Sequence, residues 1–189
     1  MPATNAAIWY AADGYDPGAK GINGRRVAGE SFLRGFFRHG DVAEFVSLAH
    51  ASADHAGFAA MARAQGVTRP LRAVPLHAPS QLAPVEVIYH PAPLPTRECW
   101  RRAAHGGAAW ALCGITHTTA TQAVMEELFT LRSAPQMPWD ALICTSTAVQ
   151  HSVRSLMELA EAHLASRFPG ATLPARPLLP VIPLGIHAE

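Results

Sequence analysis

Short, continuously apolar runs alternate along the chain with longer stretches in which apolar residues recur every three or four positions. A run of the first kind is typical of a strand covered on both faces, and the second pattern is typical of a helix with one buried side. The apolar runs predict strands at residues 6–12, 44–50, 72–76, 85–89, 108–115 and 139–145. A last β-like run at 179–186 contains prolines, which favours an edge strand or an exit from the sheet.

The periodic stretches predict helices between these strands. They cover about residues 31–39, 52–65, 96–104 and 119–131, and a further helix of some twenty residues begins near residue 147. Thr96, Thr119 with Gln122, Thr147 with Gln150, and Ser146 stand where they would cap helix N-termini. Strands that alternate with helices indicate a mostly parallel sheet with helices on both faces. We therefore expect residues 1–189 to form one Rossmann-like α/β domain.

The composition agrees with a folded protein of ordinary charge. Apolar residues make up 49% of the 189 residues, charged residues 15%, and the formal net charge is +1. The small net charge gives no reason to expect nucleic acid or anionic lipid as a partner. The N-terminal residues lack a basic segment followed by a long apolar stretch, and no apolar run reaches the ~18 residues of a membrane span. We expect a cytoplasmic protein.

Two kinds of chemistry are disfavoured by spacing. The three cysteines, Cys99, Cys113 and Cys144, form no C-x-x-C pair, and the ten histidines are scattered without zinc-ligand spacing, so no metal site is expected. The sequence also lacks the G-x-S-x-G elbow of an esterase.

Ligands of open α/β sheets bind outside the carboxyl ends of the strands, so the segments that follow strands are the ones to search. The first such segment contains Gly21, Gly24 and Gly29, interleaved with Arg25 and Arg26. Glycines permit positive φ and close backbone approach, and a helix N-terminus favours a phosphate. The alternative interpretation is a flexible surface loop. The spacing differs from the dinucleotide fingerprint and from the P-loop, which disfavours both of those families.

Three segments carry a resemblance to a known family. Residues 20–36 read KGINGRRVAGESFLRGF, residues 140–149 read DALICTSTAV across a strand-to-helix junction, and residues 182–186 read IPLGI. With the early strand, and in this order, they resemble the N-terminal half of GT-B glycosyltransferases. The most similar subgroup is the retaining, family 4-like one, which includes many sucrose-synthase-like and bacterial polysaccharide enzymes.

In that family the N-terminal domain binds the acceptor, and the C-terminal domain binds the nucleotide sugar through contacts that include an E-x7-E motif. The resemblance implies that this chain ends where the second domain would begin, so the donor-binding domain is expected to be absent. The chain alone is then an inactive part of a glycosyltransferase. The full-length enzyme would use a nucleotide-diphosphate sugar as donor, a sugar or glycoconjugate as acceptor, and no cofactor.

The resemblance also implies roles for single residues. His117 follows the fifth predicted strand, where the family has a histidine facing the donor sugar, and its imidazole would act near the departing phosphate. Gly21, Gly24 and Arg25 would form the loop at the donor phosphates. The alternative for His117, as a single histidine in a threonine-rich turn, is a loop or capping residue.

Three further residues are candidates for contact with the acceptor. Asp13 follows the first strand, Glu30 lies at the start of the next helix, and His90 follows the fourth strand. The two acids also have explanations without a ligand, since aspartate is frequent in turns and acids stabilise helix N-termini.

Two expectations concern association and an alternative function. Leu184 and Ile186 would continue into the partner domain, so their exposure is expected to favour self-association. The alternative function is a stand-alone small α/β ligand-binding or regulatory domain. The acidic phosphoacceptor pocket of response regulators and the short phosphate loop of flavodoxins are not evident in the sequence.

Overall fold

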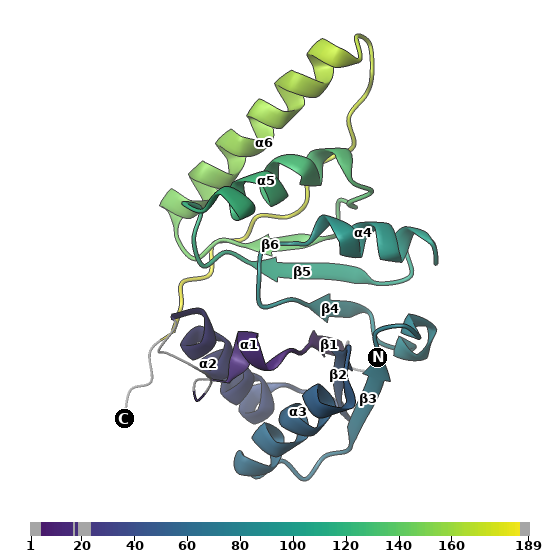
Figure 1. Ribbon diagram of the computed structural model, residues 1–189, viewed down its shortest axis with the longest axis vertical. Coiled ribbons are helices and arrows are strands. Elements are labelled where there is room, and N and C mark those ends of the chain that lie inside the picture. Colours follow the sequence, from purple (N-terminus) through teal and green to yellow (C-terminus); the bar gives the residue numbers. More distant parts are fainter. Residues whose placement is uncertain (1–4, 17, 19–23, 186–189) are drawn as a thin grey trace. The chain divides into compact units, whose positions relative to one another are not determined.

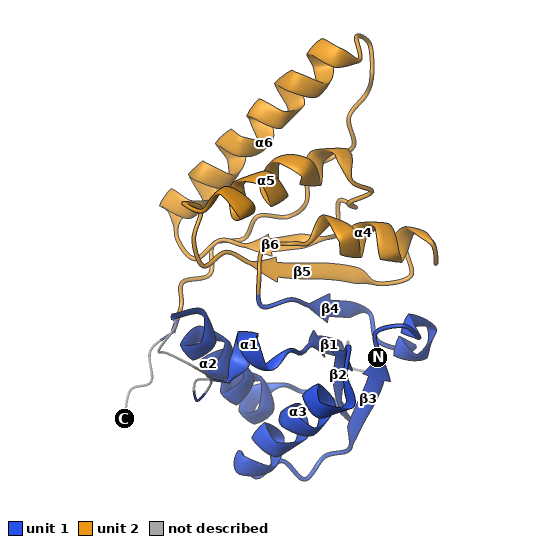
Figure 2. Cartoon of the chain, viewed as in Figure 1, with its two compact units in different colours: residues 1–91, 185–189 blue, residues 92–184 orange. Residues whose placement is uncertain are grey.

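The structure is a computed structural model of the chain, and it describes residues 5–16, 18 and 24–185 (Figure 1). Its strands pair in parallel and alternate with helices along the chain. The fold is α/β of Rossmann-like type, with six parallel strands flanked by helices, and the predicted fold class is confirmed. The chain divides into two compact units, one of residues 1–91 with 185–189 and one of residues 92–184 (Figure 2).

Unit 1 is built on four strands in the order β3-β2-β1-β4. Ile8 of β1 lies opposite Ser47 of β2 on one side and opposite Tyr89 of β4 on the other. The elements of unit 1 are β1 (Ala6–Trp9), α1 (Ala12–Tyr15), α2 (Gly24–His39), β2 (Phe45–Ala49), α3 (Ser52–Ala64), β3 (Leu71–Pro75), the short 3-10 helix η1 (Pro79–Leu82) and β4 (Val87–Tyr89).

Aromatic side chains form much of the core of unit 1. Phe45 of β2 meets Phe37 of α2 edge to face, with 5.1 Å between ring centroids, and Phe37 meets Phe58 of α3 in the same way at 5.3 Å. Such edge-to-face pairs add stabilisation beyond the burial of their area. All five residues of β2 are buried, as expected for a strand between two neighbours and covered on both faces. This cluster fixes α2 and α3 within the unit.

Unit 2 contains the remaining two strands, which pair in parallel with Cys113 opposite Ala141. Its elements are α4 (Thr96–Ala103), β5 (Ala111–Ile115), α5 (Gln122–Thr130), the 3-10 helix η2 (Leu131–Ser133), β6 (Ala141–Ile143) and α6 (Thr147–Arg167). After α6 the chain returns to β6 and makes two isolated parallel bridges, at Leu178 and Val181. Pro180 offers only its carbonyl group, to Cys144 N, because proline has no N–H. The final β-like run therefore pairs at single positions rather than as a strand.

A buried ion pair anchors unit 2. The guanidinium of Arg102 on α4 and the carboxylate of Asp140, just before β6, are both fully buried and pair through two hydrogen bonds. Arg102 also donates to the carbonyl oxygens of Trp110 and Pro135, at 3.2 and 3.0 Å. Asp140 accepts hydrogen bonds from the backbone N–H groups of Leu112, at 2.8 Å, and of Met137, at 2.7 Å. Buried charges need an ion partner and hydrogen bonds of this kind. The aspartate that begins the family-like 140–149 segment is thus a structural residue.

Helix α2 begins earlier than the sequence predicted. It starts at Gly24, whereas the predicted start lay near residue 31, so the last part of the supposed loop is helical. A Cβ on Gly29 would lie 2.1 Å from the carbonyl oxygen of Gly14, which means that this glycine lets α2 pack against the backbone of α1. The glycine was read as a loop signal, but here it permits close contact between helices.

Three predicted helix caps are wrong and one is confirmed. The box predicted from Thr147 does not form, because Thr147 is the first helical residue of α6 and Ser146 holds the cap position. The cap position of α4 is Pro95, not Thr96, and Thr96 N instead donates to the carboxylate of Glu127. The cap position of α5 is Thr121, without a side-chain hydrogen bond, so the box predicted from Thr119 does not form. Ser146 caps α6 and accepts a hydrogen bond from Val149 N at 3.1 Å, as predicted.

Apolar side chains are exposed along the segment that follows α6. Leu178, Ile182 and Leu184 each have about half of their surface exposed. Ile186, the other residue on which the expectation of self-association rested, lies outside the described residues. Self-association through this segment stays a prediction.

Candidate functional site

The carboxyl end of β1 leads into a corner where α1 meets the first turn of α2. The carboxylate of Asp13 pairs there with the guanidinium groups of both Arg25 and Arg26, and the Arg26 contact is 2.6 Å. The hydrogen bond from Arg26, together with the two positive charges, lowers the pKa of Asp13 from its ordinary value. Asp13 is thus more than a turn residue, because it joins α1 to the basic start of α2.

The predicted phosphate loop is described only in part. Gly24 is the first residue of α2, and Arg25 follows it in the first turn. Gly24 is not in the left-handed region, since the glycines of positive φ in the described ranges are Gly66, Gly106 and Gly170. The argument that Gly24 is needed for positive φ is therefore wrong, whereas the open space around its Cα is compatible with close approach of a ligand. Gly21 lies outside the residues that the structure describes.

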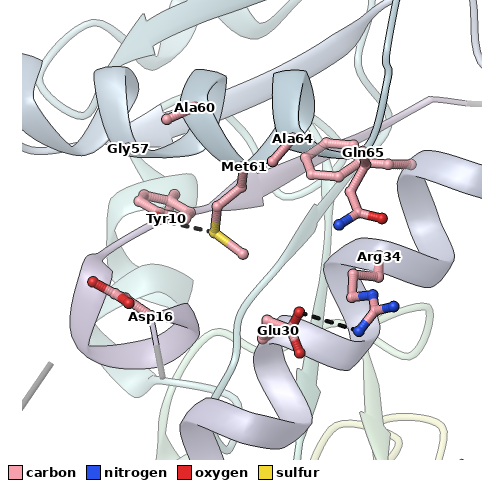
Figure 3. Close-up of a pocket in the computed structure, with 10 residues that line it drawn as sticks. Tyr10, Asp16, Glu30, Arg34, Gly57, Ala60, Met61, Ala64 and Gln65 are labelled. Atoms are coloured by element: carbon pink, nitrogen blue, oxygen red, sulfur yellow. Dashed lines mark hydrogen bonds and ion pairs between the residues drawn. The ribbon is translucent and has the colours of Figure 1, made fainter. Parts of the chain in front are cut away.

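Glu30 lines a pocket of unit 1 between α2 and α3, with a volume of about 350 Å³ (Figure 3). Its carboxylate lies 3.6 Å from the guanidinium of Arg34, one turn along α2. The volume lies toward the lower end of the roughly 300–1,000 Å³ that is usual for small-molecule sites. The lining residues are Tyr10, Asp16, Glu30, Arg34, Phe37, Gly57, Ala60, Met61, Ala64 and Gln65.

Tyr10 is a pocket residue that the sequence reasoning missed. It directly follows β1, is almost fully buried, and stacks on Tyr15 with 5.1 Å between ring centroids. Its hydroxyl group donates to the sulfur of Met61 at 3.4 Å (Figure 3). Burial, and then the carboxylates of Asp16 and Asp54, raise the pKa of Tyr10 to about 12, so the hydroxyl stays protonated. A tyrosine near the end of the apolar run at residues 6–12, before a predicted loop, was the signal available in the sequence.

His90 directly follows β4 but lies in the core of unit 1. Its ring is almost fully buried and packs on Trp9 with 5.8 Å between ring centroids. This environment favours a packing role over contact with a soluble acceptor. Glu30 is therefore the predicted acceptor residue that the structure places in a pocket, while Asp13 lies in the arginine corner described above.

His117 belongs to unit 2 and follows β5 by two residues, at the carboxyl end of that strand as predicted. The residue before it, Thr116, is fully buried, and both its N–H and its hydroxyl group donate to the carbonyl oxygen of Ile143 at 3.0 Å. These two hydrogen bonds tie the backbone that precedes His117 to β6. The side chain of His117 is partly exposed.

Cysteine chemistry has no support in this structure. Burial raises the pKa of the Cys99 thiol to about 12 and that of Cys113 to about 11, and burial also raises the pKa of Cys144. A thiol that stays protonated is a poor nucleophile. Within residues 5–16, 18 and 24–185, no three histidine, cysteine, aspartate or glutamate side chains gather as a metal site would require. No helix in the same part of the chain has the length and apolarity of a membrane span.

Comparison with known proteins adds no assignment. No protein-family model matches the chain, and neither a curated protein nor a solved structure matches it significantly. Any proposal about function therefore depends on the residues and geometry described above.

Proposed function

We propose that the chain is the acceptor-side domain of a GT-B glycosyltransferase whose donor is a nucleotide-diphosphate sugar. The observation that carries the proposal is the pocket between α2 and α3, which Tyr10, the residue after β1, also lines. It combines two carboxylates, a guanidinium, an amide and a tyrosine hydroxyl with apolar side chains. Polar groups of this density, placed on an apolar wall, suit a polyhydroxylated molecule, which needs many hydrogen bonds and offers apolar C–H faces.

The corner of Asp13, Arg25 and Arg26 supports the donor side of the proposal. Two guanidinium groups at a helix N-terminus after the first strand are the chemistry that binds a diphosphate. In the structure Asp13 neutralises them in part. A diphosphate carries more negative charge than one carboxylate, so it can compete with Asp13 for the arginines.

His117 is proposed to act on the donor sugar. In the transfer, the bond between the anomeric carbon and the diphosphate oxygen breaks, and a bond from the same carbon to an acceptor oxygen forms with retained configuration. The acceptor proton leaves with the departing diphosphate. Hydrogen bonds aimed at the charge that develops in this step are the usual source of rate enhancement. The cytoplasmic location expected from the sequence stays a prediction.

A stand-alone ligand-binding domain is the alternative function, because the same pocket can hold a ligand without any transfer. A direct assay separates the two. The full-length protein is incubated with single UDP- or GDP-sugars and a panel of polyols, and mass spectrometry looks for an acceptor heavier by one glycosyl unit. We expect a product that is lost in Arg25→Ala/Arg26→Ala and in His117→Ala.

Two results would contradict the transferase. The first is the absence of product with every donor while the pocket still binds polyols, which favours the stand-alone domain. The second is tight and specific nucleotide-sugar binding by the 189-residue chain alone, because the acceptor-side domain is expected to hold few donor contacts. Calorimetry measures that binding directly.

A further inference from the structure

Residues 172–184, which we call the strap, run back from the end of α6 to β6 within unit 2 (Figure 1). Of these residues only Pro177 is buried. Arg132 and Gln136 donate to two consecutive carbonyl oxygens of the strap, at 2.5 and 2.6 Å, and Gln150 donates to a third at 2.6 Å. The strap is therefore held mainly by polar contacts, and its own side chains add little to the core.

Along β6 the strap takes the place of a neighbouring strand. Strand β6 is the last in the order of the sheet, and four backbone hydrogen bonds of 2.8–2.9 Å join residues 140–144 to the strap. Val181 forms a parallel bridge with Cys144, which fixes the register between the two segments. Without the strap, the outer edge of β6 would present unpaired backbone groups, and such an edge readily pairs with another strand.

Complementary charge fixes the strap at a second place. Arg176 of the strap donates to both carboxylate oxygens of Glu161 on α6, at 2.8 and 2.5 Å, and lies 3.5 Å from Glu158. Glu161 also accepts a hydrogen bond from Arg132 at 2.7 Å. The Arg176 and Glu161 side chains are 31% and 21% exposed, so water screens part of this attraction.

The connection between α6 and the strap is an exposed turn. Every residue of 165–172 is exposed, Gly170 has a φ of +83°, and the N–H of Ala171 donates to the carbonyl oxygen of Phe168 at 3.1 Å. Pro169 and Pro174 favour an extended backbone at the residues that precede them. Straightening this turn thus breaks few contacts, which makes it a suitable hinge.

We propose that the strap is exchanged between two copies of this chain: each strap leaves its own β6 while unit 2 stays folded, and docks on β6 of the other copy. Because the sequences are identical, every hydrogen bond and ion pair of the strap is remade in the exchanged dimer, and only the hinge differs. Leu178, Ile182 and Leu184, each about half exposed in one chain, provide apolar surface that favours association. The proposal does not depend on glycosyl transfer.

Two chains with one cysteine each test the exchange. The first keeps Cys144 and carries Cys99→Ala with Cys113→Ala; the second carries Val181→Cys with all three native cysteines replaced by alanine. Bridge partners on adjacent strands lie about 5 Å apart, within the range of a disulfide. After mixing and oxidation with oxidised glutathione, we expect a covalent dimer of one chain of each kind, whose fraction rises with protein concentration. Mass spectrometry identifies it.

Two controls check the register and exclude random collision. A single chain that carries both Cys144 and Val181→Cys should form an internal disulfide at low concentration. In the second control Leu184→Cys replaces Val181→Cys, because Leu184 is also exposed on the strap but forms no bridge with Cys144. This chain should not cross-link to Cys144 of the other chain. Circular dichroism checks that all variants are folded.

The rate of exchange gives an independent measurement. Glu161→Gln removes the charge that holds Arg176, so cross-linking should become about tenfold faster. Its matched control is Glu158→Gln on the same helix, which should change the rate less, since Glu158 is 63% exposed and farther from Arg176. The final fraction of exchanged dimer should change little in both variants, because the same contact is lost in the single chain and in the dimer.

Four results would overturn the proposal. The first is an internal disulfide in the two-cysteine chain with no covalent dimer in the mixture at any concentration. The second is a dimer in light scattering without the interchain disulfide, which would assign association to the apolar side chains alone. The third is cross-linking by Leu184→Cys as efficient as that by Val181→Cys. A two-cysteine chain that forms no internal disulfide would contradict the register itself.

Discussion

Replacing Arg102 by Met should destabilise unit 2 more than any surface substitution. The side chains of Arg102 and Asp140 are both fully buried, so the change leaves a carboxylate in the core without its cation. Two backbone N–H groups, those of Leu112 and Met137, would still reach this carboxylate. Removing one partner of a buried ion pair typically costs about 3–5 kcal/mol.

Such a loss is large beside the total stability of about 5–15 kcal/mol that is typical of a folded protein. At roughly 2–4 °C per kcal/mol for a protein of this size, Tm should fall by roughly 6–20 °C. Urea unfolding followed by circular dichroism gives the free energy directly. The control is Arg154→Met, an exposed position of α6 in the same unit. Surface substitutions of this kind usually change the free energy of unfolding by less than about 0.5 kcal/mol, so the control should change little.

The double substitution Arg102→Met with Asp140→Leu sharpens the test. Replacing both members of a buried ion pair with apolar residues of similar volume is often neutral or stabilising. Here the double substitution should not restore stability fully, because the N–H groups of Leu112 and Met137 would lose their acceptor, at about 1–3 kcal/mol for each buried donor left unsatisfied. If Arg102→Met lowered the free energy of unfolding by less than the control, the ion pair would not be the anchor that we describe.

Three further predictions concern other parts of the chain. Gly29→Ala should lower the unfolding free energy by about 1–3 kcal/mol through overpacking against α1, whereas Gly24→Ala, which meets no atom within 4 Å, should not; thermal unfolding that ranks them in the opposite order would contradict this. If the chain belongs to the transferase proposed above, His117→Ala should reduce its turnover about a hundredfold with little loss of acceptor binding, and near-normal turnover in a folded variant would return His117 to a loop role. The hydrogen bond from Arg176 lowers the pKa of Glu161, so the stabilisation that Glu161 contributes is present above its ordinary pKa and is lost as the pH falls through its lowered pKa. The stability difference between Glu161→Gln and the unchanged protein should therefore shrink on acidification, and a difference independent of pH would refute it.

The sequence predicted the order of elements well because that order depends on local patterns. The strand runs of residues 44–50 and 108–115 correspond to β2 and β5, and the helix predicted at 52–65 corresponds to α3. The wrong predictions concern residues whose structural role is set by a contact with another segment and not by their neighbours in the sequence. Gly29 signals a loop by itself, yet it lies inside α2 because α1 packs against it. Thr96 has the identity of a cap, but Glu127, distant in the chain, binds its N–H.

The candidate site was predictable to a smaller extent. The positions of His117 and Glu30 follow from the rule that ligands bind near the carboxyl ends of strands and at the helices that follow them. That rule does not predict which side chains surround the candidate residues. The pairing of Asp13 with Arg25 and Arg26, and the packing of His90 on Trp9, bring together residues separated by many positions in the chain.

By itself the sequence determined the α/β class, the succession of strands and helices, and the cap of α6 by Ser146, because periodicity and capping act over a few neighbouring residues. Only the tertiary structure decided that Tyr10, Asp16 and Glu30 share a pocket with Gly57. It also decided that Asp140 is the ion-pair partner of Arg102. The physical reason is that burial and electrostatic pairing depend on which distant segments the packed core brings within a few ångströms, and that information is not contained in local spacing.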